Sequence, residues 1–551
     1  MNVSEAIVKM LESVGVERMF GGSGHSVVGM LLTIKKASKH LKAIMVKNEQ
    51  AASFMACGYA MFSDKLGVCF SSGGPGEFNL LSGLAVALSD SLPVLAISGH
   101  VSEAEKGKGA LNESSGLRRT PDARAIFAAT TKKSFIVEHP DQICDIMEEA
   151  VNLAFEGRPG PVHIHLPKSV VMADVKNFRE IKLNIKPVLP DPATIREFAQ
   201  VLEKALTAKE QIVALIGYGA VRSHAEQELL AFVEQFQIPF ITTMDAKGIL
   251  SEDHPLSLGG LGRSGDPGAK KYFDQSKIVL AIGNSFAQNA TYAFQEDLYQ
   301  NKVLMHINID AEEISKVYHA DYRMVSDVKP AIAGLTAELS RTIRSVEPKT
   351  IVKEKWYDLP IEYSGSKIYP ADMVKVLSRN LPENAIVLGD AGANMLWLYC
   401  YLKMTKRQNY QNPGSFGPMA SHVNGAIGIK CANPDRPVIS GCGDGDYLMA
   451  GFELLTAVEN NIPVIWIVFN NGDLSVNKYF MIQTFGEHAY MQFKNPDYAA
   501  YAKACGAVGY TVTKLEDFEP VLQEALRLNQ PVLIDVVIES EVYPPFHLGR
   551  A

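Results

Sequence analysis

The sequence predicts an α/β protein made of three doubly wound domains, each built on a mainly parallel sheet. Short apolar runs of strand length alternate along the chain with segments of helical periodicity, which is the pattern of βαβ units. The chain has 551 residues, enough for about three domains of roughly 100–200 residues. Two proline-containing stretches, at 184–192 and about 348–369, look like linkers. We therefore expect domains at 1–183, 190–340 and 360–551.

The predicted strands follow in chain order, each an apolar run that is followed by helical periodicity. In the first domain these runs are 67–72, 93–99 and 161–166; in the second, 212–217, 278–283 and 303–309; in the third, 385–388, 437–440, 463–469 and 531–537.

Composition excludes several classes of protein. With 53 basic and 61 acidic residues the net charge is −8, which argues against nucleic-acid binding. No apolar run reaches the roughly 18 residues that a membrane span needs, and residues 1–10 lack the pattern of a signal peptide. The seven cysteines show no CxxC spacing, so they indicate neither a zinc site nor a disulfide framework and suit a reducing compartment. We expect a cytoplasmic enzyme that acts on a small molecule.

The first and third domains share one plan. In the first, residues 57–60 lead to an apolar strand, the turn Gly74-Pro75-Gly76, a helix and a second strand. In the third, residues 425–428 lead to the same series, with Gly443-Asp444-Gly445 as the turn. This predicts a repeated supersecondary unit of which only the second copy carries an acid in its turn. A ligand could lie between the two copies if they were paired face to face.

The strongest chemical signal is the turn Gly443-Asp444-Gly445, followed one strand later by Asn470-Asn471. Parallel strands end at the same edge of a sheet, so Asp444 and Asn471 should meet where α/β proteins bind ligands. A carboxylate and an amide oxygen are hard ligands suited to Mg²⁺ that also holds a phosphate-bearing partner. The glycines allow close backbone approach, and the helix that follows presents N–H groups to a diphosphate.

With this motif the chain resembles the thiamine-diphosphate (ThDP) enzymes of the acetolactate synthase and pyruvate oxidase superfamily. The resemblance covers nearly the whole chain and includes segments 47–52, 72–76, 217–219, 253–259 and 414–430. It implies a pyrimidine-binding domain, a central domain and a diphosphate-binding domain, in that order. It also implies a homodimer or homotetramer in which each active site lies between two chains.

The resemblance assigns cofactor roles to individual residues. Glu49 matches the glutamate that hydrogen-bonds the aminopyrimidine and so activates the thiazolium C2. Met419 matches the large apolar residue that holds the cofactor bent. The metal ligands would be Asp444, Asn471 and the main-chain carbonyl of Asp473. Further expected cofactor contacts are Gly443, Gly445, Asp446, Gly417 and Asn394.

Substrate-facing positions depart from the family. His25 lies in the loop 21–26 where acetolactate synthases carry a small residue, and an imidazole there could donate to a carboxylate or alkoxide. Asn112 keeps an amide at the position of the family's glutamine, after Leu111. Asn477 and Phe480 replace a small apolar residue and a tryptophan. Residues 287–289, Ala-Gln-Asn, replace an Asp-Asp-Arg motif, which leaves FAD doubtful.

The resemblance favours decarboxylation of a pyruvate-like 2-oxo acid, followed by ligation of the resulting carbanion to an acceptor carbonyl. A simple 2-oxo acid decarboxylase and a flavin-linked oxidase are alternatives. A non-catalytic ThDP-fold subunit is a third, which the retained Glu49, Asp444 and Asn471 disfavour. A nicotinamide-dependent enzyme is disfavoured because neither glycine turn is a full GxGxxG.

Overall fold

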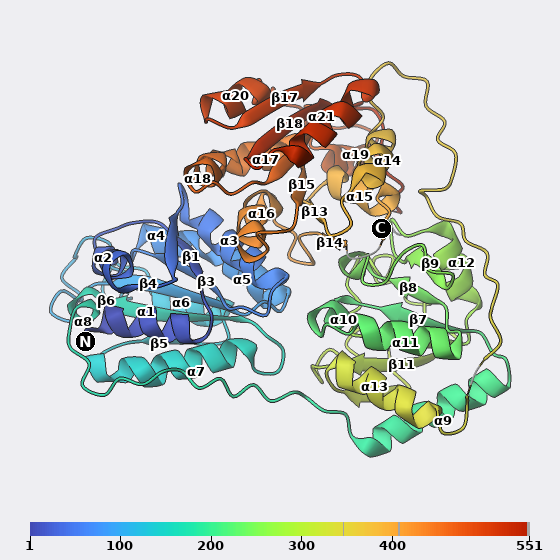
Figure 1. Ribbon diagram of the computed structural model, residues 1–551, viewed down its shortest axis with the longest axis horizontal. Coiled ribbons are helices and arrows are strands. Elements are labelled where there is room, and N and C mark those ends of the chain that lie inside the picture. The colour runs from blue at the N-terminus through green and yellow to red at the C-terminus, as the bar shows by residue number, and fades with distance from the viewer. Residues whose placement is uncertain (345, 406–407, 548–551) are drawn as a thin grey trace.

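The chain folds into three sheets, each of six strands, in a computed structural model that describes residues 1–344, 346–405 and 408–547. Every strand pairing is parallel, and helices flank each sheet (Figure 1). Apolar side chains are buried on both faces of each sheet. The predicted fold class is therefore confirmed. The two proline-containing stretches predicted as linkers contain neither helix nor strand over 184–190 and 349–366.

The N-terminal sheet has the strand order β2-β1-β3-β4-β6-β5. Its strands are β1 (Arg18–Gly21), β2 (Lys42–Met45), β3 (Gly67–Ser71), β4 (Val94–His100), β5 (Ser134–Ile136) and β6 (Pro161–Pro167). Its helices are α1 (Val3–Ser13), α2 (Val28–Ala37), α3 (Glu49–Met61), α4 (Pro75–Asn79), α5 (Leu81–Ser89), α6 (Ala123–Thr130), α7 (Ile143–Phe155) and α8 (Lys168–Val171), with a 3₁₀ turn at Pro140–Gln142.

The central sheet has the order β12-β11-β10-β7-β8-β9. Its strands are β7 (Ile212–Ile216), β8 (Phe240–Thr242), β9 (Ser257–Gly260), β10 (Ile278–Ile282), β11 (Val303–Asn308) and β12 (Tyr322–Val325). Its helices are α9 (Pro192–Thr207), α10 (Tyr218–Arg222), α11 (Glu226–Phe236), α12 (Pro267–Gln275) and α13 (Val328–Leu339), with a 3₁₀ turn at Met244–Ala246.

The C-terminal sheet has the order β14-β13-β15-β16-β18-β17. Its strands are β13 (Ile386–Gly389), β14 (Asn409–Gln411), β15 (Val438–Gly443), β16 (Ile465–Asn470), β17 (Val508–Val512) and β18 (Val532–Val537). Its helices are α14 (Pro370–Asn380), α15 (Ala393–Tyr401), α16 (Ser421–Ala432), α17 (Asp444–Ala450), α18 (Leu454–Glu459), α19 (Ser475–Phe485), α20 (Tyr498–Ala504) and α21 (Leu515–Arg527), with a 3₁₀ turn at Gly451–Glu453.

The predicted repeat is confirmed by the strand order. Numbered within its own domain, each terminal sheet runs second, first, third, fourth, sixth, fifth. In both, the third strand leads through a glycine turn into a short helix, α4 in one copy and α17 in the other. The third residue of each helix, Glu77 or Asp446, accepts a hydrogen bond from the main-chain N–H of the glycine that precedes the helix.

The two repeat domains pack together through α3 and α16, which lie side by side in Figure 1. Residues Ala51–Met61 of α3 are all buried, as expected of a helix that is apolar all round. Glycines bring the two backbones together: a Cβ at Gly58 would collide with the carbonyl oxygen of Gly425, and one at Gly428 with that of Met55. This contact holds the N- and C-terminal domains of one chain in a fixed arrangement.

Among the described residues, no helix combines the length and the apolar character that a membrane crossing requires.

Candidate functional site: two half-sites at two sheet edges

A cavity of about 390 Å³ opens at the carboxyl edge of the C-terminal sheet, next to the ends of β15 and β16. It gathers residues that are far apart in the sequence but were predicted to share a site. Its lining includes Asn394, Gly417, Met419, Gly443, Asp444, Gly445, Asp446, Asn471, Asp473 and Asn477.

Asp444 is the centre of this half-site. Its Oδ2 accepts hydrogen bonds from the main-chain N–H of Asn471 at 3.0 Å, from that of Gly472, and from the Asn495 side chain at 2.7 Å. Burial raises the pKa of the Asp444 carboxyl, while the hydrogen bonds from Asn495 and the main chain lower it. A cation beside this carboxyl would favour its ionised form.

The other two predicted metal ligands lie close by. The Asn471 side chain is oriented by two hydrogen bonds: its Nδ2 donates to Ser475 Oγ at 2.6 Å, and its Oδ1 accepts from the Asp473 N–H at 3.1 Å. The Asp473 Oδ2 forms an ion pair with the buried Lys478, at 3.0 Å, and its Oδ1 is buried without a hydrogen-bond partner among the described residues. The ligand predicted from Asp473 is its main-chain carbonyl and not this side chain.

Two buried polar groups and one apolar side chain complete the C-terminal half-site. Asp446 Oδ2 accepts from the Gly443 N–H, and its buried Oδ1 has no hydrogen-bond partner among the described residues. Burial, with the neighbouring Asp390, raises the pKa of the Asp446 carboxyl well above its usual value. Asn394 is fixed by Asp390 and lines the cavity, and the Met419 Cε lies 3.2 Å from where a Gly445 Cβ would be.

Glu49 lies at the equivalent edge of the N-terminal sheet, at the start of α3. Its carboxylate is half-buried against two glycines: a Cβ at Gly22 would lie 2.7 Å, and one at Gly76 3.1 Å, from Glu49 Oε1. Asn79 donates to Oε2 at 2.9 Å. Residues with side chains at 22 and 76 would displace this carboxylate, so the glycines explain how it reaches the sheet edge.

The predicted substrate residues of the N-terminal domain lie in two loops, one between β1 and α2 and one between β4 and α6. His25 is exposed, whereas Ser26 points inward and accepts from the Gly73 N–H at 3.3 Å. Asn112 has a left-handed backbone, φ 61°, and packs against the turn at Gly73 and Gly74. Leu111 is 87% exposed.

Within one chain the two half-sites stay apart. The described residues that line the C-terminal cavity all come from the C-terminal domain, so Glu49, His25, Leu111 and Asn112 do not reach it. Phe480, on α19, is 49% exposed and also lies outside the lining. The structure thus brings most predicted residues together in two groups, one at each sheet edge.

Two positioning residues escaped sequence reasoning. Asn495 donates both to Asp444 and to Asn470 Oδ1 at 2.7 Å. Glu453 accepts the main-chain N–H groups of Lys47 and Asn48, at 2.9 and 3.0 Å, and so ties the C-terminal domain to the segment that carries Glu49. Both contacts join segments distant in sequence. The sequence carries no local motif for either.

A Gly-Asp-Gly turn, an adjacent asparagine and a separate glutamate at the matching sheet edge define a protein that binds a diphosphate cofactor. Comparisons with known proteins agree. The N-terminal TPP (thiamine pyrophosphate) binding domain, the central domain and the C-terminal TPP binding domain of thiamine pyrophosphate enzymes match residues 1–118, 199–335 and 390–536. The chain belongs to the thiamine pyrophosphate enzyme family, and its cofactor is thiamine diphosphate, the same compound.

Curated relatives are similar over nearly their full length. A probable acetolactate synthase large subunit of Methanocaldococcus jannaschii is 33% identical over 99% of this chain and 93% of its own length. One of Methanococcus aeolicus is also 33% identical, over 98% of this chain and 92% of its own length. The acetolactate synthase large subunit of Corynebacterium glutamicum is 29% identical over all of this chain and 89% of its own.

Proposed function

We propose that this protein is a ThDP- and Mg²⁺-dependent enzyme that decarboxylates a pyruvate-like 2-oxo acid and ligates the resulting two-carbon unit to an acceptor carbonyl, as an acetolactate synthase does. The observation that carries the proposal is the cavity at Asp444, which collects the metal and cofactor residues expected of a ThDP enzyme. The names of relatives similar over almost the whole chain support the reaction class.

The residues present fit a Mg²⁺-bound diphosphate. Asp444, the Asn471 amide and the Asp473 carbonyl supply three hard oxygens, few enough to leave positions for diphosphate and water. Gly443 and Gly445 line the cavity at the start of α17, where glycine, without a Cβ, lets an anion come close to the backbone. When bound, ThDP supplies a nucleophilic carbon and an electron sink.

Glu49 is proposed to hold and move the proton that the aminopyrimidine exchanges. Because Glu49 and the Asp444 cavity lie in separate half-sites, we propose that the site is completed between subunits of a homodimer or homotetramer. Residues 1–183 of one subunit would bind the pyrimidine, and residues 360–551 of another would bind the diphosphate.

The substrate side is proposed to be more polar than in acetolactate synthases. His25 and Asn112, with Leu111, would meet Asn477 and Phe480 of the other half-site around the 2-oxo acid. An imidazole and two amides can donate to a carboxylate or to a developing alkoxide. A simple decarboxylase remains the second candidate, because these extra donors could equally direct a proton to the decarboxylated product.

The test is a product screen. The purified chain is incubated with ThDP, Mg²⁺ and a panel of 2-oxo acids, alone and with acceptor aldehydes and ketones. Formation of 2-hydroxy-ketone products supports ligation, whereas release of the aldehyde alone supports the second candidate. Bound flavin that the 2-oxo acid reduces would favour an oxidase instead. The Asp444→Ala protein is the control for contaminating activity, and no product with any substrate would contradict the proposal.

Subunit complementation tests the shared site. Mixing inactive Glu49→Gln with inactive Asp444→Ala protein, under conditions of subunit exchange, gives hybrid dimers with one intact pair of half-sites. Activity should recover to about a quarter of wild type, because about half of the dimers are hybrids and each has one good site. No recovery despite demonstrated exchange would place both half-sites of each active centre in one chain.

A further inference from the structure

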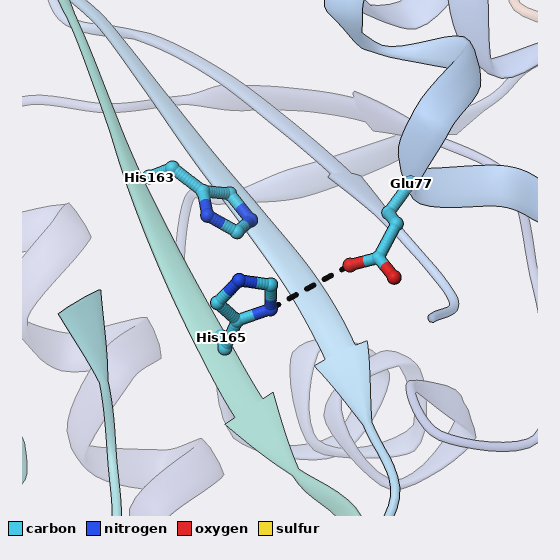
Figure 2. A group of neighbouring side chains, drawn as sticks. All are labelled: Glu77, His163 and His165. Atoms are coloured by element: carbon cyan, nitrogen blue, oxygen red, sulfur yellow. Dashed lines mark ion pairs between the residues drawn. The ribbon is translucent and has the colours of Figure 1, made fainter. Parts of the chain in front are cut away.

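The core of the N-terminal domain holds a polar cluster that the proposed function does not use. Glu77 on α4, Ser98 on β4, and His163 and His165 on β6 are each at most 1% exposed. Figure 2 shows Glu77, His163 and His165 pointing toward one another across the space between the helix and the strands. His163 and His165 share this face because side chains two apart on a strand point the same way.

The spacing of the four side chains suits a metal ion. The Ser98 hydroxyl donates a hydrogen bond to Glu77 Oε2 at 2.8 Å, and its Oγ is within hydrogen-bond distance of His163 Nε2 at 2.9 Å and of His165 Nδ1 at 3.3 Å. Glu77 Oε2 and His165 Nδ1 are 3.5 Å apart, and one donor atom from each of Glu77, His163 and His165 falls within 4.8 Å of the others. A tetrahedral Zn²⁺ with bonds near 2.0–2.1 Å separates its ligand atoms by about 3.3 Å.

The side chains around the cluster orient these donors as outer-shell partners of a metal do. His163 Nδ1 is hydrogen-bonded to Ser134 Oγ at 3.0 Å, which leaves Nε2 directed at the cluster, and the ring stacks on Phe127 at 3.7 Å. Glu77 Oε1 accepts from the Gly74 N–H and the Ser114 hydroxyl, which leaves Oε2 facing the imidazoles.

The Glu77 carboxyl group is fully buried beside imidazoles. Among the described residues it forms an ion pair with neither lysine nor arginine, and its neighbour of opposite type is the His165 imidazole, 3.5 Å away. Two imidazole nitrogens, His165 Nε2 and His100 Nδ1, are buried without hydrogen-bond partners among the described residues. The centroids of these two rings are 5.2 Å apart. A divalent cation would offset the carboxylate charge that burial otherwise penalises.

We propose that Glu77, His163 and His165, with Ser98 as fourth ligand, bind a divalent transition-metal ion of the Zn²⁺ class. Two imidazoles and one carboxylate favour such an ion over Mg²⁺, which prefers all-oxygen sites. Four protein ligands leave no open position, so the ion is structural. It joins β4 and β6 to the turn at Gly74, and through Ser114 to the loop that carries Asn112.

The test supplies Co²⁺ during expression, so that the proposed metal site can bind the ion while the chain folds. The full-length protein is expressed in minimal medium with Co²⁺ in place of Zn²⁺ and purified in excess Mg²⁺, which occupies the proposed site at Asp444. We expect about one Co²⁺ per chain, with the strong visible absorption of four-coordinate cobalt, displaced by Zn²⁺. Asp444→Ala should keep this absorption, so the test of the Glu77 site does not depend on the proposed ThDP chemistry.

Variants then locate the ion. Glu77→Gln should lose the absorption, with affinity weakened beyond about 100-fold, since even outer-shell changes cost roughly 10–100-fold. Ser134→Ala should weaken metal retention within that outer-shell range. Ser4→Ala is the matched control: it removes the hydroxyl of a buried serine of the same domain, which donates to the Val171 carbonyl at 3.0 Å. Folded wild-type protein that carries no Co²⁺, or only six-coordinate Co²⁺, would overturn the proposal whatever the variants do.

Discussion

The N- and C-terminal domains repeat one supersecondary unit, yet they use it in opposite ways. Both place a carboxylate at the third position of the helix after the glycine turn, Glu77 in α4 and Asp446 in α17, and both carboxylates cap a glycine N–H. Around Glu77 the neighbouring strands supply Ser98, His163 and His165, and the cluster is closed. Around Asp446 the corresponding edge opens into a cavity.

The first residue of each helix explains the difference. It is Pro75 in α4 and Asp444 in α17. The acid in the second copy takes hydrogen bonds from the loop after β16 and directs that loop around the cavity. In the first copy the glycines at the sheet edge instead make room for Glu49, which arrives from α3. The same topology thus gives one sheet edge with the cavity at Asp444 and another that carries Glu49, and a few residues at the turns make the difference.

The largest effect is expected at the acid that distinguishes the two turns. Asp444→Ala should weaken ThDP binding in Mg²⁺ by about 100-fold or more, the scale of removing one partner of a buried charged pair. Titration calorimetry measures this. With Mg²⁺ removed by a chelator, wild type and variant should bind ThDP equally, since the missing interaction passes through the cation. Unchanged affinity in Mg²⁺ would refute the metal assignment.

At the other edge the expected loss is in proton exchange and not in binding. Glu49→Gln keeps the side-chain volume but cannot hold a transferable proton, so bound ThDP should exchange its C2 proton about 100-fold more slowly. Quenched-flow exchange followed by NMR gives the rate, and ThDP affinity in the same protein serves as the control. Exchange at the wild-type rate would remove Glu49 from its proposed role.

The difference between the two domains also shows which features of the fold and the site could be predicted from the sequence. Apolar runs and glycine turns predicted the repeat and the Asp444–Asn471 pair, because strand ends in a parallel sheet meet by topology. Short strands at the sheet edges, such as β2 and β14, were not predicted, since three or four residues of mixed character carry little periodicity.

The closed cluster was not predicted for a different reason. Glu77, Ser98 and His163 come from three elements whose approach depends on the packed sheet, and no fixed spacing connects them. Cysteine spacing, the usual sequence signal of a zinc site, is lacking here. The histidines at 163 and 165, two residues apart in an apolar strand, were the available signal, because two polar residues on one buried face need partners.

A smaller effect is expected at the loop over Glu49. His25→Ala should lower turnover about tenfold or change the product distribution, with ThDP affinity unchanged, because an imidazole near pH 7 can both donate and relay a proton. Steady-state kinetics on the substrate found by the product screen decide. Ser26→Ala is the comparison variant, since Ser26 faces Gly73. Loss of turnover in Ser26→Ala alone would assign the proposed substrate role to Ser26 in place of His25. Normal kinetics in both variants would mean that this loop has no role in catalysis.

The smallest effect concerns the contact through which the two repeats meet. Gly58→Ala and Gly428→Ala each push a Cβ into a carbonyl oxygen of the facing helix, so we expect a loss of about 1–3 kcal/mol from overpacking and a lower Tm in thermal scans.

Gly425 supplies the matched control on the same contact. A Cβ there would lie 3.5 Å from the Phe54 carbonyl oxygen, an ordinary contact, so Gly425→Ala should be neutral or stabilising by up to about 1 kcal/mol, the helix propensity gained. The three variants leave every residue of both half-sites in place. If Gly58→Ala and Gly425→Ala have the same Tm, close backbone approach does not hold the repeats together; if they differ as expected, the glycines set the distance between the Glu49 edge and the Asp444 edge within each chain.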